Sequence, residues 1–129
     1  MPPTNVKRGD IFYVELPEHE SQGSEQHGRR PCVVVSANLI NDRFNIAVVV
    51  PLSSVVTKAN RQHRILIPEQ HKLAEPGTCG CPGESIALCE QIRMVSKMRL
   101  DNVRVAHLTA TAMGSVEAGI SYVLNIGLG

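Results

Sequence analysis

A short charged segment lies directly before an apolar run in this chain. In GSEQHGRRPCVVVS (residues 23–36), Glu25, His27, Arg29 and Arg30 precede CVVVS, which has the composition of a buried strand. Because Arg30 precedes a proline, its backbone is biased toward an extended conformation, and its side chain leaves the strand in a constrained direction. A guanidinium held in this way can bind a phosphate through two parallel hydrogen bonds.

Groups able to transfer protons and to donate hydroxyl hydrogens accompany these arginines. Glu25 and His27 are titratable, and Ser53 and Ser54 end the apolar run NIAVVVPLSS (residues 45–54). Arginine, hydroxyl and carboxylate together suit cleavage of a phosphodiester without a metal. A base removes the proton of a ribose 2′-OH, the arginine stabilises the dianionic phosphorane, and an acid protonates the leaving 5′-oxygen. The residues alone also fit a solvated surface loop.

The composition describes a globular chain without a strong overall charge. It has 129 residues, 43% of them apolar, and a net charge of +1, so we expect one domain spanning 1–129 and only a local concentration of positive charge. No apolar run is long enough to cross a bilayer, and MPPTNVKRGD at the N-terminus lacks the apolar core of a signal peptide, so we expect a cytoplasmic protein. Aromatic stacking on bases would depend on four residues, Phe12, Tyr13, Phe44 and Tyr122.

Short strands must position these groups. Five segments are rich in β-forming residues and separated by Gly, Pro and Asn: DIFYVEL (10–16), PCVVVS (31–36), NIAVVVPLSS (45–54), HRILI (63–67) and ESIALCEQIRMV (84–95). ANLINDRF between the second and third segments is expected to be a loop. Closely spaced strands of this kind predict a compact, mainly antiparallel barrel or sandwich.

The C-terminal segment changes to a helical period. Thr109 is a plausible N-cap, and Gly114 and Gly119 weaken the helix by about 1 kcal/mol each relative to alanine, so packing must stabilise it. The apolar positions that fall on one face are Met113, Val116, Ile120, Val123 and Leu124.

The four cysteines fall into two kinds. Cys32 and Cys89 lie within apolar runs and are expected in the core, whereas Cys79 and Cys81 form a C-x-C in PGTCGCPG. That spacing favours two exposed, dispensable thiols in a reducing compartment. A metal site completed by the upstream histidines, His63 and His71, is the less favoured alternative.

Four ordered segments resemble the MazF/PemK family of toxin ribonucleases. They are KRGDIFYVEL (7–16), GSEQHGRRPCVVVS (23–36), NIAVVVPLSS (45–54) and LCEQIRMVSKMRL (88–100), and with the helix the resemblance covers about residues 7–124. It implies a mainly β fold, a small SH3-like barrel of the PemK/CcdB type with a C-terminal α-helix, acting as a homodimer. It also implies metal-independent, sequence-specific cleavage of single-stranded RNA, chiefly mRNA, with no cofactor. A cognate antitoxin protein would neutralise the activity by laying an acidic disordered tail across the RNA groove.

The resemblance also assigns roles to residues. The family's catalytic arginine directly precedes the proline and corresponds to Arg30, its catalytic hydroxyl corresponds to Ser53, and the glutamate of G-S-E-Q corresponds to Glu25. The remaining polar residues of these segments are candidates for substrate binding: Arg29, His27, Ser54, Gln91 and Arg93.

Three departures from the family pattern stand out. Ser53 replaces the usual threonine, the stretch between Leu16 and Gly23 is about two residues longer, and the cysteine-containing loop AEPGTCGCPG is unfamiliar. The longer first loop means that cleavage specificity does not carry over. Two alternatives share the fold: a CcdB-like gyrase-poisoning toxin, disfavoured because the chain has no Trp, and a non-catalytic barrel that binds RNA or protein.

Overall fold

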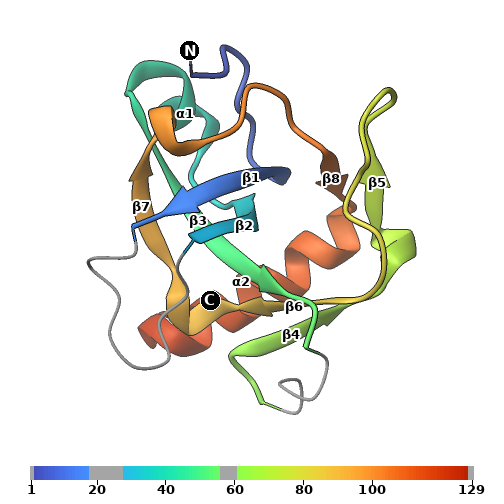
Figure 1. Cartoon of the computed structure of the whole chain (residues 1–129). Coiled ribbons are helices and arrows are strands. Elements are labelled where there is room, and N and C mark those ends of the chain that lie inside the picture. Colours follow the sequence, from blue (N-terminus) through green and yellow to red (C-terminus); the bar gives the residue numbers. More distant parts are fainter. Residues whose placement is uncertain (1, 18–27, 56–60, 128–129) are drawn as a thin grey trace.

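Antiparallel strands wrap into a small, nearly closed barrel with one long helix at the C-terminal end, as Figure 1 shows for the computed structural model. The structure describes residues 2–17, 28–55 and 61–127. This architecture confirms the expected fold class. Within these residues, no helix has the length and apolar character needed to span a membrane.

The strands form one sheet in the order β4-β6-β3-β2-β1-β8-β5, and β7 pairs with β3. Every pairing is antiparallel. The strands are β1 (Asp10–Leu16), β2 (Gly28–Val34), β3 (Ile46–Ser53), β4 (Arg64–Ile67), β5 (Lys72–Ala74), β6 (Ser85–Leu88), β7 (Arg93–Ser96) and β8 (Ala106–Leu108). Within the described residues, the helices are α1 (Asn38–Arg43) and α2 (Ala110–Leu124), and the short 3₁₀ turns are η2 (Glu69–His71), η3 (Cys89–Gln91) and η4 (Lys97–Arg99).

The strands differ from the sequence prediction in three places. β2 begins at Gly28 rather than at residue 31, because the two arginines also pair with β1. The segment 84–95 is not one strand: η3 divides it into β6 and β7, which both pair with β3 in registers three residues apart. The loop expected after residue 36 contains α1.

Two apolar clusters cover opposite faces of the central strands. Ile11, Val33 and Val50 belong to the cluster on the α2 side, whereas Phe12 and Val34 belong to the other. Neighbouring residues of a strand point to opposite faces, so a strand buried on both faces needs an unbroken apolar run. This explains why the second half of β2, Cys32–Val34, and β3 up to Leu52 are continuously apolar rather than alternating.

The C-terminal helix forms as expected and packs against the barrel. Figure 1 shows α2 crossing the lower half of the molecule, where it contacts β4, η3 and β8. The Thr109 hydroxyl oxygen caps the helix by accepting a hydrogen bond from the backbone N–H of Ala112 at 3.2 Å. Val116 is fully buried on the packed face, but Leu124 at the end is 49% exposed and does not belong to it.

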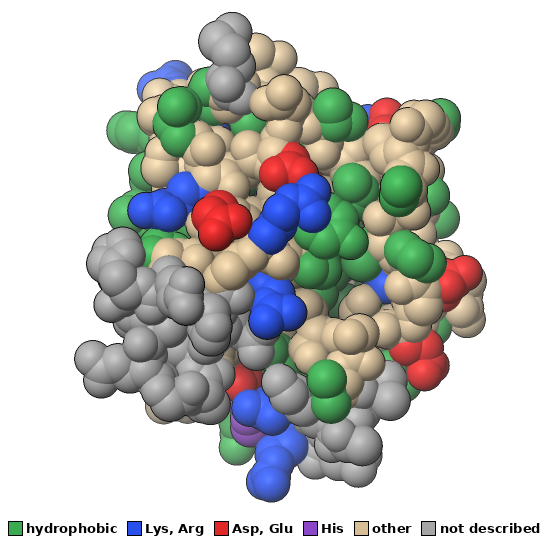
Figure 2. Space-filling view, in the orientation of Figure 1, with side chains coloured by type: hydrophobic (Ala, Val, Ile, Leu, Met, Phe, Trp, Pro, Cys, Tyr) green, Lys and Arg blue, Asp and Glu red, His purple; other side chains and the backbone are tan. Residues whose placement is uncertain are grey.

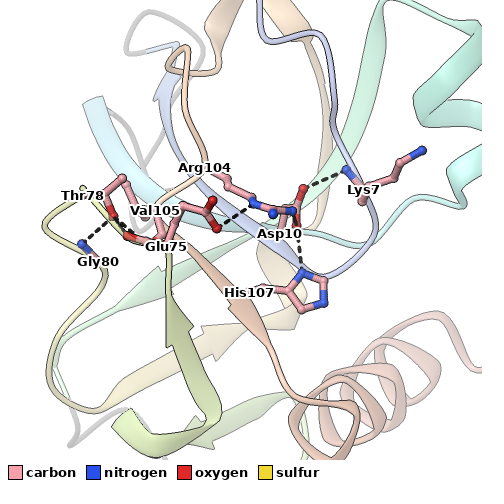
Figure 3. A network of polar contacts seen from close by, with 8 residues as sticks. All are labelled: Lys7, Asp10, Glu75, Thr78, Gly80, Arg104, Val105 and His107. Atoms are coloured by element: carbon pink, nitrogen blue, oxygen red, sulfur yellow. Dashed lines mark hydrogen bonds and ion pairs between the residues drawn. The ribbon is translucent and has the colours of Figure 1, made fainter.

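A buried carboxylate ties the first strand to the last one. The Asp10 side chain is 0% exposed and accepts hydrogen bonds from the Lys7 backbone N–H at 2.9 Å, from Arg104 at 3.2 Å and from His107 Nδ1 at 2.8 Å (Figure 3). Arg104 also binds Glu75 at 3.1 Å, as Figure 3 shows. The network thereby fixes the start of the loop that follows β5 and carries the C-x-C cysteines.

Candidate active site

The candidate site lies where two neighbouring strands separate. β2 pairs with β1 from Gly28 to Val33, but its ladder with β3 starts only at Cys32↔Pro51. Pro31 and Pro51 have no N–H to donate, so the ladder cannot continue through them in the usual way. The start of β2 and the end of β3 therefore diverge.

A cavity of about 460 Å³ opens at this divergence, a size within the usual range for ligand sites. It brings together two arginines, two hydroxyls at the end of β3 and part of the cysteine loop. The lining residues are Tyr13, Arg29, Arg30, Pro31, Leu52, Ser53, Ser54, Val55, Cys81, Pro82 and Ser85.

Arg30 and Ser53 line the cavity from the two strands that diverge. Each lies two residues beyond the last pair of the ladder, Cys32↔Pro51, so side-chain alternation puts both on the face of the sheet that Cys32 and Pro51 share. Arg30 is exposed, and Ser53 is 9% exposed. The Ser53 oxygen accepts a hydrogen bond from the backbone N–H of Val55 at 3.2 Å, which orients the hydroxyl and leaves its hydrogen as the donor toward a ligand.

Arg29 is next to Arg30 in β2, and its guanidinium contacts an aromatic ring and a carboxylate. Its guanidinium lies 4.3 Å from the centroid of the Tyr13 ring and forms an ion pair with Asp101. The hydrogen bond that Arg29 donates to the Asp101 carboxylate raises the pKa of Arg29, and burial raises the pKa of Tyr13. These contacts hold the positive charge of Arg29 at one wall of the cavity.

Gln91 and Arg93 lie outside the cavity. Arg93 donates to the Gln91 backbone oxygen at 3.4 Å and to its side-chain oxygen at 3.1 Å. Side-chain alternation nevertheless places Arg93, like Val95, on the same face of the sheet as Cys32 and Arg30. The charge of Arg93 reaches this face, since it lowers the pKa of Cys32 against the larger effect of burial.

Glu25 and His27 lie outside the described residues, so the two candidates for proton transfer have no position relative to the cavity. The cysteines expected in the core, Cys32 and Cys89, are both 0% exposed. Cys79 is exposed as expected, but Cys81 is buried at 8% because the loop folds back onto the cavity wall.

The four residues of the alternative metal site, Cys79, Cys81, His63 and His71, do not form a cluster. His71 contacts the Thr109 hydroxyl at 2.7 Å, and His63 stacks on Tyr122 with ring centroids 6.2 Å apart. Across residues 2–17, 28–55 and 61–127, no group of three or more His, Cys, Asp or Glu side chains could hold a metal ion.

Four residues with polar groups that line or support the cavity were not predicted as site residues: Tyr13, Asp101, Cys81 and Ser85. Tyr13 had a signal as one of the few aromatic residues, and Cys81 had one as part of the C-x-C, although for a metal site rather than for this cavity. Cys81 reaches the cavity through the loop that follows β5. The Thr78 hydroxyl stabilises this loop, because it donates a hydrogen bond to the backbone oxygen of Glu75 at 2.7 Å and accepts one from the Gly80 N–H at 3.2 Å (Figure 3).

The surface around the site carries a local concentration of positive charge. Figure 2 shows Lys and Arg side chains in a broken row from the centre of the drawn face to its lower end, beside an apolar patch. The net charge of only +1 means that acidic side chains nearly balance the cations over the molecule as a whole, and Figure 2 shows some of these acids beside the row.

Comparison with known proteins assigns the chain to a family. Residues 7–124 match the model of the PemK-like, MazF-like toxins of type II toxin–antitoxin systems. The chain belongs to this family. The endoribonuclease EndoA of Bacillus subtilis (strain 168) is 32% identical over 116 residues, which cover 89% of this chain and 90% of that protein.

Solved MazF structures share the fold. The Mycobacterium tuberculosis toxin MazF-mt6 has a TM-score of 0.69 at 12% identity, covering 92% of this chain and 98% of that one. A mycobacterial endoribonuclease in complex with its cognate antitoxin has a TM-score of 0.68 at 16% identity, covering 97% of this chain and 100% of that one. The barrel with its C-terminal helix is therefore the fold of MazF toxins.

Proposed function

We propose that this chain is the toxin of a type II toxin–antitoxin system and cleaves single-stranded RNA, chiefly mRNA, at specific sequences without a metal. One observation carries the proposal: the arginine before the proline and the serine that ends β3 line the same cavity, each two residues beyond the last pair of the β2–β3 ladder. The 32% identity to EndoA, which is named an endoribonuclease, supports it.

The chemistry is an in-line attack by the neighbouring 2′-hydroxyl. The 2′-oxygen forms a bond to phosphorus as its proton passes to a base, and the bond from phosphorus to the 5′-oxygen breaks as an acid protonates that oxygen. The products are a 2′,3′-cyclic phosphate and a 5′-hydroxyl. Arg30 stabilises the dianionic phosphorane, and Ser53 donates its hydroxyl hydrogen to a phosphate oxygen. Glu25 transfers protons in this scheme.

The other polar candidates bind the RNA. Arg29 and Ser54 contact it within the cavity, and Arg29 with Tyr13 offers a flat surface on which a base can stack. Arg93 with Gln91 extends the binding surface on the neighbouring part of the sheet, and His27 contributes from the charged segment before β2.

The nature of the products tests this mechanism. Purified protein is incubated with total mRNA in EDTA, and the ends at each cut are sequenced and tested for a cyclic phosphate. We expect cleavage to persist, and to stop when the nucleotide 5′ to the cut is a deoxynucleotide, because the nucleophile is then missing. Cleavage of the deoxy substrate, or a requirement for added Mg²⁺, would defeat the mechanism. Binding of RNA without cleavage would favour a non-catalytic barrel.

Two partners belong to the proposal. A second copy of the chain completes a homodimer, since a small barrel buries a limited share of its surface and leaves apolar side chains such as Met94 and Met98 more than 60% exposed. Light scattering at micromolar concentration should give twice the mass of one 14.0 kDa chain. The other partner is a cognate antitoxin with an acidic disordered tail, a proposal supported by the mycobacterial complex.

A further inference from the structure

Lys72, the first residue of β5, is a buried lysine with unusual surroundings. Lys72 is only 5% exposed, and its Nζ donates hydrogen bonds to the Ser85 hydroxyl at 2.6 Å and to the Cys81 sulfur at 3.5 Å. The backbone position is fixed, because Lys72 pairs with Leu108 of β8. Because the side chain is buried, its ammonium group cannot reach solvent by a simple change of rotamer.

No carboxylate of the described residues forms an ion pair with Lys72. Its two partners, a hydroxyl and a thiol, are neutral groups. The buried Asp10 is a contrast, since Arg104 forms an ion pair with it. Removing an ammonium from water without an acid partner is costly, so an uncompensated buried cation indicates that an anion completes the site.

The partners of Lys72 belong to the wall of the candidate active site. Ser85 and Cys81 line the cavity that holds Arg30 and Ser53. Ser53 pairs with Ile86, the neighbour of Ser85 on β6, so Ser85 lies one strand away from the end of β3.

Lys72 itself lines a second cavity that shares the wall of the first. This second cavity is also lined by Glu69, whose carboxylate accepts a hydrogen bond from the Gly83 N–H and forms no ion pair with Lys72. Cys81 and Pro82 line both cavities. The ammonium therefore lies at the boundary between the two hollows, behind the hydroxyl of Ser85.

We propose that Lys72 and Ser85 bind a backbone phosphate of the RNA next to the phosphate held by Arg30. Because the Ser85 oxygen accepts a hydrogen bond from the ammonium, its own hydrogen points elsewhere and can be donated to a phosphate oxygen in the cavity. The ammonium polarises this hydroxyl and supplies the positive charge. Strands β2 and β6 lie on opposite sides of β3, roughly 10 Å apart at two strand spacings, which favours a neighbouring phosphate over the one being cleaved. This inference rests on the proposed cleavage of RNA.

The test compares RNA binding with stability in the variants Lys72→Met and Ser85→Ala. The ligand is an RNA oligomer containing a cut site mapped for the wild-type protein, with a deoxynucleotide at the cut so that it binds without reacting. Lys7→Met and Ser115→Ala are matched controls. Lys7 loses the same charge from the surface, where it pairs with Asp42, and Ser115 loses a hydroxyl from the exposed side of α2.

We expect both cavity variants to bind this RNA on the order of tenfold more weakly, as for loss of one charge-assisted hydrogen bond. For Lys72→Met, the slope of log affinity against log salt should become shallower by about 0.7, the value for one phosphate contact on a single strand. Its urea midpoint should stay the same or rise, because an uncompensated charge has left the interior. The two controls should bind like the wild type.

Two results would overturn the inference. One is RNA binding by both cavity variants that equals the wild type. The other is weaker binding by Lys72→Met only together with a lower urea midpoint, while Ser85→Ala binds normally, which would make Lys72 a structural residue.

An anion test separates this inference from the proposed function. Inorganic phosphate, added at constant ionic strength, should raise the thermal midpoint of the wild type more than that of Lys72→Met. A wild type that neither binds nor cleaves RNA would refute the proposed function, and the phosphate shift would still decide whether an anion site exists. Equal phosphate shifts in the two proteins contradict the site.

Discussion

At the scale of single residues, the site depends on a proline that follows an arginine. Pro31 interrupts the ladder between β2 and β3, and the resulting gap exposes Arg30 beside Ser53. The same local feature, an X-Pro step at the entrance of a strand, is visible in the sequence. The sequence therefore predicts the extended backbone at Arg30, whereas its place beside Ser53 depends on how β2 and β3 pair and then diverge.

Arg30→Ala should lower the rate of RNA cleavage by a hundredfold or more, roughly the cost of losing one main donor to the transition state. Single-turnover cleavage measures this rate, and the urea midpoint should stay unchanged because Arg30 is exposed. Arg43→Ala, which removes an exposed charge from α1, is the control. Ser53→Ala should slow cleavage less, since Arg30 keeps the charge stabilisation. Full activity of Arg30→Ala would move the catalytic role elsewhere.

Cys32 gives the folded protein a sensitivity to alkaline pH. Burial raises the pKa of its thiol from 9.0 to about 12. Between these values the unfolded chain loses the thiol proton and the folded protein keeps it, so the free energy of unfolding falls as pH rises, by about 1.4 kcal/mol per pH unit. Cys32→Ala removes this contribution. Urea unfolding across the window should show a shallower decline for the variant than for the wild type. Parallel declines would show that the thiol ionises equally in both states.

At the scale of elements, the sequence predicts the long apolar strands and the C-terminal helix. It does not predict the elements whose bounds are set by tertiary contacts. β1 has the predicted bounds because its composition and its pairing agree. Segment 84–95 has β-forming residues on both sides of Glu90 and Gln91, and these two polar residues also fit one continuous, half-buried strand. Composition alone therefore does not fix the bend at Cys89–Gln91 that lets β6 and β7 meet different parts of β3. β5 and β8 have three residues each, too few for a period to be visible.

Lys72 and Ser85 show the same limit within the site. A lysine next to His71 in a polar stretch indicates an exposed side chain, and only the pairing of β5 with β8 buries it. The cavity wall is assembled from segments distant in sequence, so its composition cannot be read from any one of them.

Two glycines of α2 provide a matched test of how the helix packs. A Cβ at Gly114 would meet no atom within 4 Å, whereas one at Gly119 would lie 2.6 Å from the Cys89 sulfur and 3.0 Å from Ile65. Gly114→Ala should raise the free energy of unfolding by up to about 1 kcal/mol through helix propensity. Gly119→Ala should lower it by about 1–3 kcal/mol, because overpacking outweighs that gain. Urea denaturation measures both, and a stabilising Gly119→Ala would contradict the close packing of α2 on η3 and β4.

At the scale of the whole molecule, the distribution of charge fits the proposal that a nearly neutral chain binds a polyanion. The net charge is +1, yet Arg29 and Arg30 line one cavity and the buried Lys72 lies behind its wall. Figure 2 shows Lys and Arg side chains in a broken row on the drawn face. The same surface suits RNA and an acidic peptide, which makes competition between them the simplest way for an antitoxin to inhibit the toxin.

Binding of the cognate antitoxin should therefore depend on salt and on the arginines of the cavity. Its affinity should fall as ionic strength rises, because exposed charges more than about 10 Å apart are screened at 0.1 M salt and bound counterions compete with the acidic tail. Arg30→Ala should weaken binding by on the order of tenfold at low salt and by less at high salt, whereas Arg43→Ala should have little effect at either. Calorimetric titration at two salt concentrations measures all three proteins, and non-cleavable RNA should displace the antitoxin in the same assay. An affinity unchanged by salt, or an antitoxin that binds together with RNA, would place its docking site away from this cavity.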